Sequence, residues 1–85
     1  MRLDKYLKVS QIIKRREIAK QCIDRGLVTL NGKVAKAASS VEVNDLIVIS
    51  SRDEVKKYRV LIVKEHATKE QAKEMYEVLW FYRSF

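Results

Sequence analysis

The spacing of apolar residues changes at Gly26 from the period of a helix to the period of a strand. Before Gly26, apolar residues recur three and four positions apart, whereas after it they gather in short runs separated by turn residues. Gly26 itself suits the left-handed residue that follows the end of a helix. Eighty-five residues make about one small domain. We therefore expect an α+β protein with helices first and a small sheet after them.

Two short helices are predicted before Gly26. The first covers residues 2–8, and its apolar face is formed by Leu3, Tyr6 and Leu7. The second covers Arg16 to Arg25, and its buried stripe is formed by Ile18, Ala19, Cys22 and Ile23. Because Cys22 is the single cysteine and lies in that stripe, we interpret it as a small buried side chain rather than a reactive or metal-binding thiol.

Strands and a final helix are predicted after Gly26. Asn31-Gly32 is typical of a tight hairpin turn, here between residues 27–30 and 33–35. Residues 46–49 and 57–63 give two more strands, and the unbroken apolar run 60–63 implies burial on both sides or cover from a helix. Thr68 and Gln71 match a helix capping box. The helix that follows would carry an apolar stripe of Ala72, Met75, Tyr76 and Leu79.

The net charge of +7 lies entirely in the first half of the sequence. Residues 1–40 contain ten basic and three acidic side chains, whereas residues 41–85 contain eight of each. The plain alternative is a solvated basic face, but such a concentration of Lys and Arg favours a polyanionic partner such as nucleic acid. The longest apolar runs are too short to cross a bilayer, and no secretion leader opens the chain. We therefore expect a cytoplasmic protein with no membrane partner.

Residues that catalysis requires are scarce. The sequence has one His and one Cys, in segments that are not predicted to be neighbours. Its two glycines are explained by a helix end and a hairpin turn, which leaves no glycine-rich phosphate loop. We therefore expect no enzymatic activity, no metal site and no cofactor.

Several motifs at fixed spacing indicate a known domain. They are Arg2-Leu3-Asp4, Lys14-Arg15-Arg16, Ile18-Ala19-Lys20, Gly26, Asn31-Gly32, Ser40 and Asn44-Asp45-Leu46-Ile47-Val48. Over residues 1–50 they resemble the S-four RNA-binding domain, also called the alpha-L RNA-binding motif. The resemblance implies two short helices packed at an angle on a small bent antiparallel sheet, with RNA against the basic helical face. Residues 51–85 would add a strand and a C-terminal helix packed on the same core.

The sequence departs from the family pattern at two positions. Asn44 stands where the family usually has Gly, and we expect the turn to survive because Asn tolerates a positive φ. Arg15 stands where the second helix usually begins with a Ser or Thr cap. Arg15 is a poorer cap, but it makes the local cluster of cations denser, as phosphate contact would favour.

The expected RNA contacts follow from the charge and from this resemblance. Asp4 would orient Arg2 or Arg16 by an ion pair. Lys8 and Lys5 are weaker candidates, because both are exposed lysines on a helix, where the plain role is solvation. The candidate RNA-binding residues are Arg2, Asp4, Lys8, Lys14, Arg15, Arg16 and Lys20.

The whole chain also resembles a narrower family of short stand-alone bacterial proteins related to the heat-shock S-four ribosome-binding protein. Residues 1–10, residues 13–16 and residues 75–79 carry this resemblance. It implies a role in ribosome-associated quality control on large subunits obstructed by a nascent chain. There such a protein would contact 23S rRNA and peptidyl-tRNA and support C-terminal alanine tailing by its partner RqcH. Away from the ribosome we expect a monomer.

Other functions remain open at this stage. One is a generic ribosomal-RNA-binding or ribosome-recycling heat-shock factor without a role in tailing. Another is an appendage of an RNA-modifying enzyme or a tyrosyl-tRNA synthetase, although we expect a complete protein because the chain starts with Met1 and closes on a capped helix. A third is a DNA-binding helix-turn-helix factor, which the strand-rich second half disfavours. The last aromatic residues, Trp80, Phe81, Tyr82 and Phe85, are interpreted as a frayed terminus rather than a base-stacking surface.

Overall fold

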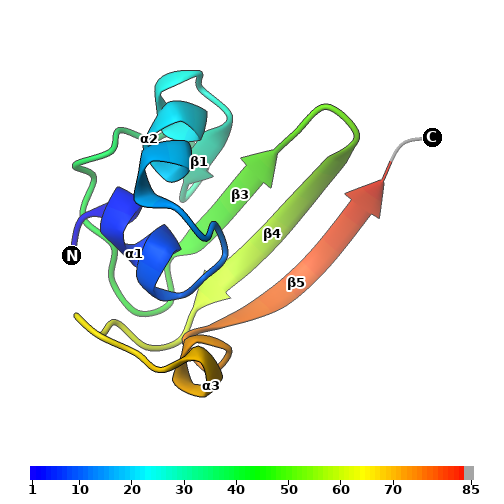
Figure 1. The fold of residues 1–85 in the computed structure, drawn as a ribbon. Coiled ribbons are helices and arrows are strands. Elements are labelled where there is room, and N and C mark those ends of the chain that lie inside the picture. The colour runs from blue at the N-terminus through cyan, green and yellow to red at the C-terminus, as the bar shows by residue number, and fades with distance from the viewer. Residues whose placement is uncertain (84–85) are drawn as a thin grey trace.

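The computed structural model describes residues 1–83, which form three helices and one five-stranded antiparallel sheet (Figure 1). In chain order the elements are α1 (Leu3–Val9), α2 (Arg16–Asp24), β1 (Val28–Leu30), β2 (Lys33–Val34), β3 (Leu46–Ser50), β4 (Glu54–Val60), α3 (Lys69–Ala72) and β5 (Tyr76–Arg83). The strand order is β2-β1-β3-β4-β5. The predicted α+β architecture, with two N-terminal helices packed on a small antiparallel sheet, is confirmed.

Local backbone chemistry explains where these elements begin and end. Gly26 has a φ of +76° directly after the C-cap of α2, as predicted for the residue that ends a helix. Asn31 and Gly32, with φ values of +51° and +84°, form the hairpin turn between β1 and β2. Asn44 has a φ of +75°, so the expectation that it replaces Gly in its turn is confirmed. The capping box at Thr68 is also present.

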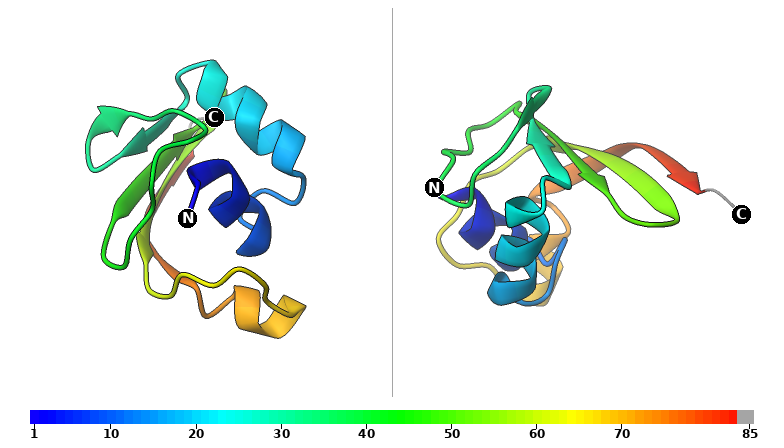
Figure 2. Two further views of the ribbon diagram at one scale, coloured as in Figure 1. Left: turned by 90° about the vertical axis from the view of Figure 1, so that its left-hand side faces the viewer. Right: turned by 90° about the horizontal axis from the view of Figure 1, so that it is seen from above.

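The core lies between the helices and the concave side of the sheet, which bends around α1 (Figure 2). The hydroxyl of Tyr6 donates a hydrogen bond of 2.7 Å to the carbonyl oxygen of Met75, which ties α1 to the segment before β5. The buried side chains that fill this space include Leu3, Tyr6, Leu7, Ala19, Ile23, Val28, Ile47, Tyr58, Val60 and Met75. None of the helices within residues 1–83 is long and apolar enough to span a membrane.

The predicted helix from Thr68 through Leu79 is wrong beyond its first turn. Helix α3 ends at Ala72, and the aromatic-rich run from Tyr76 is strand β5, paired with β4. Apolar residues at Met75, Tyr76 and Leu79 fit a helical period, but the open edge of β4 offers backbone partners, and tertiary pairing wins over local spacing. The interpretation of Trp80 to Tyr82 as a frayed terminus is therefore also wrong, whereas Phe85 lies outside the described residues.

Two other predictions of burial are wrong. Strand β4 begins and ends three residues earlier than predicted, so Leu61 and Ile62 lie beyond it and are 38% and 39% exposed. Ile18 is 42% exposed, because the buried face of α2 is centred on Ala19 and Ile23, four residues apart. Cys22 is partly buried against the core, as its position in the stripe suggested.

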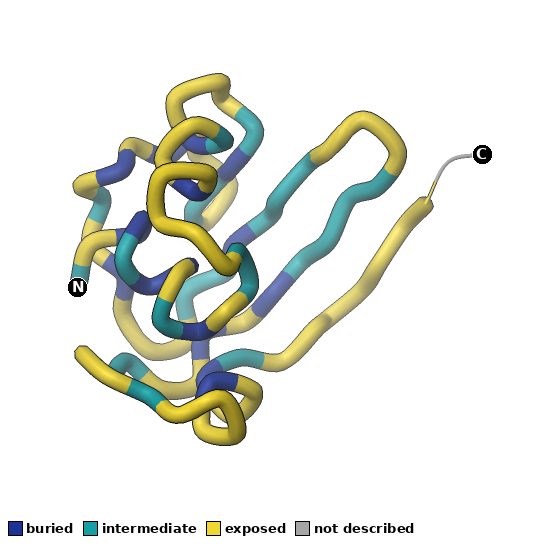
Figure 3. The backbone as a smooth tube through the Cα atoms, viewed as in Figure 1, coloured by how far each residue is buried: buried dark blue, intermediate teal, exposed yellow. Residues whose placement is uncertain are grey.

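Strands β4 and β5 extend past the helices and form a projecting arm (Figure 1). We define the β4–β5 arm as residues 54–57 with residues 80–83, which pair beyond a register shift between Lys57 and Tyr58. Almost all of β5 is exposed, unlike the strands nearer the helices (Figure 3). The arm therefore lies outside the core that positions α1 and α2.

Candidate nucleic-acid interface

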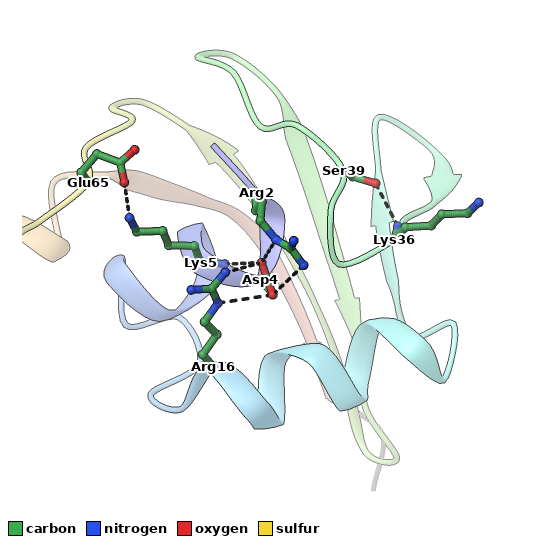
Figure 4. Close-up of polar contacts among 7 residues, drawn as sticks. All are labelled: Arg2, Asp4, Lys5, Arg16, Lys36, Ser39 and Glu65. Carbon is green, nitrogen blue, oxygen red and sulfur yellow. Dashed lines mark hydrogen bonds and ion pairs between the residues drawn. The ribbon is translucent and has the colours of Figure 1, made fainter.

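The carboxylate of Asp4 lies between two arginines that come from different elements (Figure 4). Nε of Arg2 is 3.1 Å from one oxygen of this carboxylate, and Nε of Arg16 is 3.3 Å from the other. The Asp4 side chain is 4% exposed, whereas those of Arg2 and Arg16 are 52% and 47% exposed. A buried anion thus holds two exposed guanidiniums at one place on the surface. The predicted ion pairing of Asp4 is confirmed for both arginines.

The turn that follows β2, at residues 36–39, fixes the position of this cluster. The backbone N–H groups of Leu3 and Asp4 donate to the carbonyl oxygens of Ser39 and Ala37, at 2.8 and 3.3 Å. The Ser39 hydroxyl in turn accepts a 2.9 Å hydrogen bond from the backbone N–H of Lys36 (Figure 4). These bonds anchor the start of α1 to the turn, so the backbone that leads into Asp4 is held.

The charge of Asp4 results from two opposing effects on its pKa. Burial raises the pKa of this carboxyl, but hydrogen bonds from Arg2, from Arg16 and from the backbone N–H of Lys5 outweigh burial and lower it. Asp4 is therefore ionised at neutral pH. Two guanidiniums around one carboxylate leave a net positive charge at the surface, which suits a phosphate group.

A pocket of about 670 Å³ lies next to Arg16, between α1, the loop after it and the segment that leads into α3. Two further predicted site residues, Lys8 and Lys14, line this pocket together with Arg16. The other charged or titratable side chains of the lining are Lys5, Glu65, His66 and Lys69. Lys5 forms an ion pair with Glu65 across the two segments (Figure 4).

The structure does not bring all the predicted site residues together. Arg15 and Lys20 are exposed on or beside α2, but neither lines the pocket nor pairs with Asp4. Arg15 is the N-cap of α2 and forms no side-chain capping bond within the described chain, which agrees with its expected weakness as a cap. Both residues stay predicted RNA contacts on the same helical side of the molecule.

Sequence reasoning missed the contribution of the second half of the chain. Glu65, His66 and Lys69 lie in the half whose formal charge sums to zero, and no local motif marks them. Their only sequence signal was a run of charged residues that overlaps the start of the capping box, and such a run is typical of any solvated segment. Within residues 1–83, no group of three or more His, Cys, Asp and Glu side chains is placed to hold a metal ion.

Comparisons with known proteins agree with this geometry. The model of the S4 domain family matches residues 1–47, which is more than half of the chain. An RQC P-site tRNA stabilizing factor, or RqcP, of Streptococcus pneumoniae is 46% identical over 79 residues, covering 93% of this chain and 90% of the relative. The chain belongs to the RqcP family of S4-domain proteins. The RqcP of Bacillus subtilis is 42% identical over the same length and is covered to 92%.

Two solved structures are similar in fold to this RqcP-family chain. Heat Shock Protein 15 of Vibrio cholerae superposes with a TM-score of 0.83 at 28% identity, covering 92% of this chain and 80% of that one. The solution structure of hypothetical protein HP1423 gives a TM-score of 0.78, also at 28% identity, with 92% and 95% coverage. The resemblance to the S-four domain and to its stand-alone bacterial relatives is therefore confirmed.

Proposed function

We propose that this protein is a non-catalytic RNA-binding factor of ribosome-associated quality control, which binds obstructed large subunits and stabilises their P-site tRNA. The observation that carries the proposal is the Asp4 carboxylate holding Arg2 and Arg16 side by side on the basic face of an S4 domain. The RqcP relatives are named as P-site tRNA stabilizing factors, which supports the same conclusion.

The mechanism is adhesive. A guanidinium can bind two phosphate oxygens at once, and Asp4 removes much of the rotational freedom that Arg2 and Arg16 would lose on binding. Helical RNA is recognised mainly by its shape and its phosphate positions, so ordered cations give selectivity for a folded RNA without contact to base edges. The predicted contacts are Arg2, Lys8, Lys14, Arg15, Arg16 and Lys20, on 23S rRNA and peptidyl-tRNA.

A finer part of the proposal concerns the partner RqcH. A peptidyl-tRNA that is held in place keeps its nascent chain positioned for the addition of alanine residues by RqcH, and in this way the protein would support tailing. In this account the protein supplies binding energy and RqcH brings the incoming residues. The protein acts in the cytoplasm on ribosomal particles and is a monomer when free.

Sedimentation with purified ribosomal particles tests the central claim. We expect recovery on large subunits that retain peptidyl-tRNA to exceed recovery on empty large subunits and on small subunits. Equal recovery on all three particles would reduce the function to general RNA adhesion.

Alanine tailing tests the partnership with RqcH. Cells that lack the protein should lose C-terminal alanine tails on a stalled reporter, and the parent chain should restore them. Glu77→Ala, an exposed substitution outside the proposed interface, is the matched control and should restore tails fully. Undiminished tails in the deleted cells would favour the alternative function, a ribosomal-RNA-binding or recycling factor without a role in tailing.

A further inference from the structure

The pocket beside Arg16 has a lining whose charges are far from balanced. Five cations contribute to it, namely Lys5, Lys8, Lys14, Arg16 and Lys69, against the single carboxylate of Glu65. Two of the five are partnered, because Lys5 pairs with Glu65 and Arg16 with Asp4. Within residues 1–83, no carboxylate lies within ion-pair distance of the other three. Like charges that line one hollow repel each other, and an anion that enters the hollow lowers this repulsion.

We infer that this pocket is a second phosphate-binding site for folded RNA, in which Glu65 occupies the place of a phosphate until RNA displaces it. The inference rests on the proposed RNA-binding function and extends it beyond residues 1–47, the part of the chain that matches the S4 domain. The ligand is a phosphodiester group of the RNA backbone, supplied by tRNA or by ribosomal RNA.

The position of the pocket favours this ligand. Arg16 belongs both to the Asp4 cluster and to the pocket lining, so the two sites adjoin along one face. Lys8, Lys14 and Lys69 are exposed, which lets their ammonium groups meet a backbone that runs over the surface. Successive phosphates of a folded RNA can then contact the Asp4 cluster and the pocket in turn.

Glu65 has the properties of a displaceable substitute for phosphate. Its side chain is 65% exposed, and its ion pair with Lys5 lies at the surface, where such pairs contribute little to stability. A hydrogen bond from Lys5 and the charge of Lys5 lower the pKa of Glu65, so it is ionised at neutral pH. A carboxylate and a phosphodiester each carry one negative charge. An incoming phosphate can therefore take over Lys5 while Glu65 turns outward to water.

Three single substitutions test the inference. Lys69→Gln removes a pocket cation, Glu65→Gln removes the competing carboxylate, and Lys73→Gln removes an exposed lysine of the same segment that does not line the pocket. Each variant is measured by filter binding with two separate probes, deacylated tRNA and empty large subunits, from about 50 to about 200 mM salt. All three positions are exposed, and thermal melts verify that the variants fold.

We expect opposite effects from the two pocket substitutions. Lys69→Gln should weaken binding to at least one probe about three- to fivefold and lower the slope of log K against log salt by about one. Glu65→Gln should tighten binding to that same probe about two- to fourfold and raise the slope by about one. Lys73→Gln should change the affinity less than about 1.5-fold. The probe that responds identifies the RNA that supplies the phosphate.

The inference is overturned if Lys69→Gln binds both probes no more weakly than Lys73→Gln, or if Glu65→Gln binds both no more tightly than the parent. Arg16→Ala, measured in parallel, separates this result from a failure of the proposed function. If Arg16→Ala loses affinity but the pocket variants do not, the RNA face stands and only the inference about the pocket is wrong. A parent protein that does not distinguish obstructed from empty large subunits contradicts the proposed function, whereas the response of the two probes to Lys69→Gln and Glu65→Gln still decides the pocket.

Discussion

The α1–α2 face and the β4–β5 arm use charged and apolar residues in opposite ways, where the face is the side of α1 and α2 that carries the predicted RNA contacts Arg2, Lys8, Lys14, Arg15, Arg16 and Lys20. On the face, the apolar side chains other than Ile18 are buried or partly buried, and cations such as Lys8 and Lys14 have no carboxylate partner within the described chain. On the arm, Trp80 and Tyr82 are 46% and 59% exposed, and the end of the arm is held by the Arg83–Glu54 ion pair. The face thus separates its packing from its charges, whereas the carboxylate of the arm, Glu54, pairs with two cations of the same arm, Lys56 and Arg83.

This difference decides which substitutions affect which property. A cation of the face can be removed without opening the core, because the core beneath it consists of other residues. The arm adds backbone pairing and cation–aromatic contacts, such as Lys56 and Arg83 over the ring of Phe81 at 5.3 and 5.5 Å, but few buried side chains. RNA affinity should therefore depend on the face and stability on the core, with the arm contributing little to either.

The largest expected difference is in stability, between a truncated side chain in the core and one in the arm. Leu7 is fully buried, and Leu7→Ala should lower the free energy of unfolding by about 2–5 kcal/mol, through lost burial and the cavity that remains. Trp80→Ala should cost less than about 1 kcal/mol, because nearly half of that side chain is exposed. Urea unfolding measures both. Equal losses would mean that the arm belongs to the core.

Arg16→Ala should separate RNA affinity from stability. It should weaken RNA binding by about 1–3 kcal/mol and lower the slope of log K against log salt by about one. Arg16→Lys should recover only part of the affinity, because an ammonium keeps the charge but loses the two-pronged contact. Binding titrations across salt concentrations measure this, with Glu77→Ala on β5 as the unaffected control. Parent-like binding of Arg16→Ala at every salt concentration would show that the RNA face lies elsewhere.

Asp4→Asn should make a smaller change, and that change should depend on pH. Because the pKa of Asp4 in the folded protein lies below its ordinary value of 3.8, the ionised carboxylate stabilises the fold above that pH. This stabilisation is lost as the pH falls through the lowered pKa. At neutral pH the substitution should therefore cost about 1–2 kcal/mol of unfolding free energy.

Unfolding experiments at several pH values test the pH dependence. The stability difference between Asp4→Asn and the parent should shrink as the pH is lowered below about 4. A difference that stays constant from neutral pH to pH about 2.5 would show that the charge of Asp4 is not what holds Arg2 and Arg16.

Tyr6→Phe should have the smallest of these effects. The substitution removes the hydroxyl that bonds to the Met75 carbonyl, but that oxygen still accepts a 2.8 Å hydrogen bond from the backbone N–H of Leu61. The expected cost is about 0.5–1.5 kcal/mol of unfolding free energy, with RNA affinity unchanged. Urea unfolding and binding titration together check both statements. A change in affinity would mean that α1 shifts when its tie to Met75 is lost.

Local features of the fold could be predicted from the sequence because they depend on local chemistry. The ends of α1 and α2, the Asn31-Gly32 turn and the positive φ of Asn44 depend on neighbouring residues alone. The pairing of Asp4 with both Arg2 and Arg16 was also within reach, because all three belong to motifs of fixed spacing.

What the sequence did not predict depends on contacts between distant segments. Tyr76 to Arg83 form a strand because β4 is available as a partner. The aromatic residues of the run favour a strand, but the helical spacing of Met75, Tyr76 and Leu79 indicated a helix. The pocket requires Glu65 and Lys69 to meet α1, and their approach follows from the path of the chain after β4. The comparison of net charge between the two halves of the sequence also gave no sign of Lys69. Neighbouring acids cancel its charge in the sum, although they lie outside the pocket lining.

The hydrogen bond from Tyr6 to Met75 has a consequence for the order in which the molecule assembles during its own synthesis. Its two residues are 69 positions apart, so α1 leaves the ribosomal tunnel long before the residue that completes its packing has been added. Contacts this distant in sequence form late, since closing the long loop costs entropy before any contact compensates for it. Partial chains therefore display cations on an unfinished scaffold, and the RNA-facing surface becomes complete only when the segment around Met75 docks.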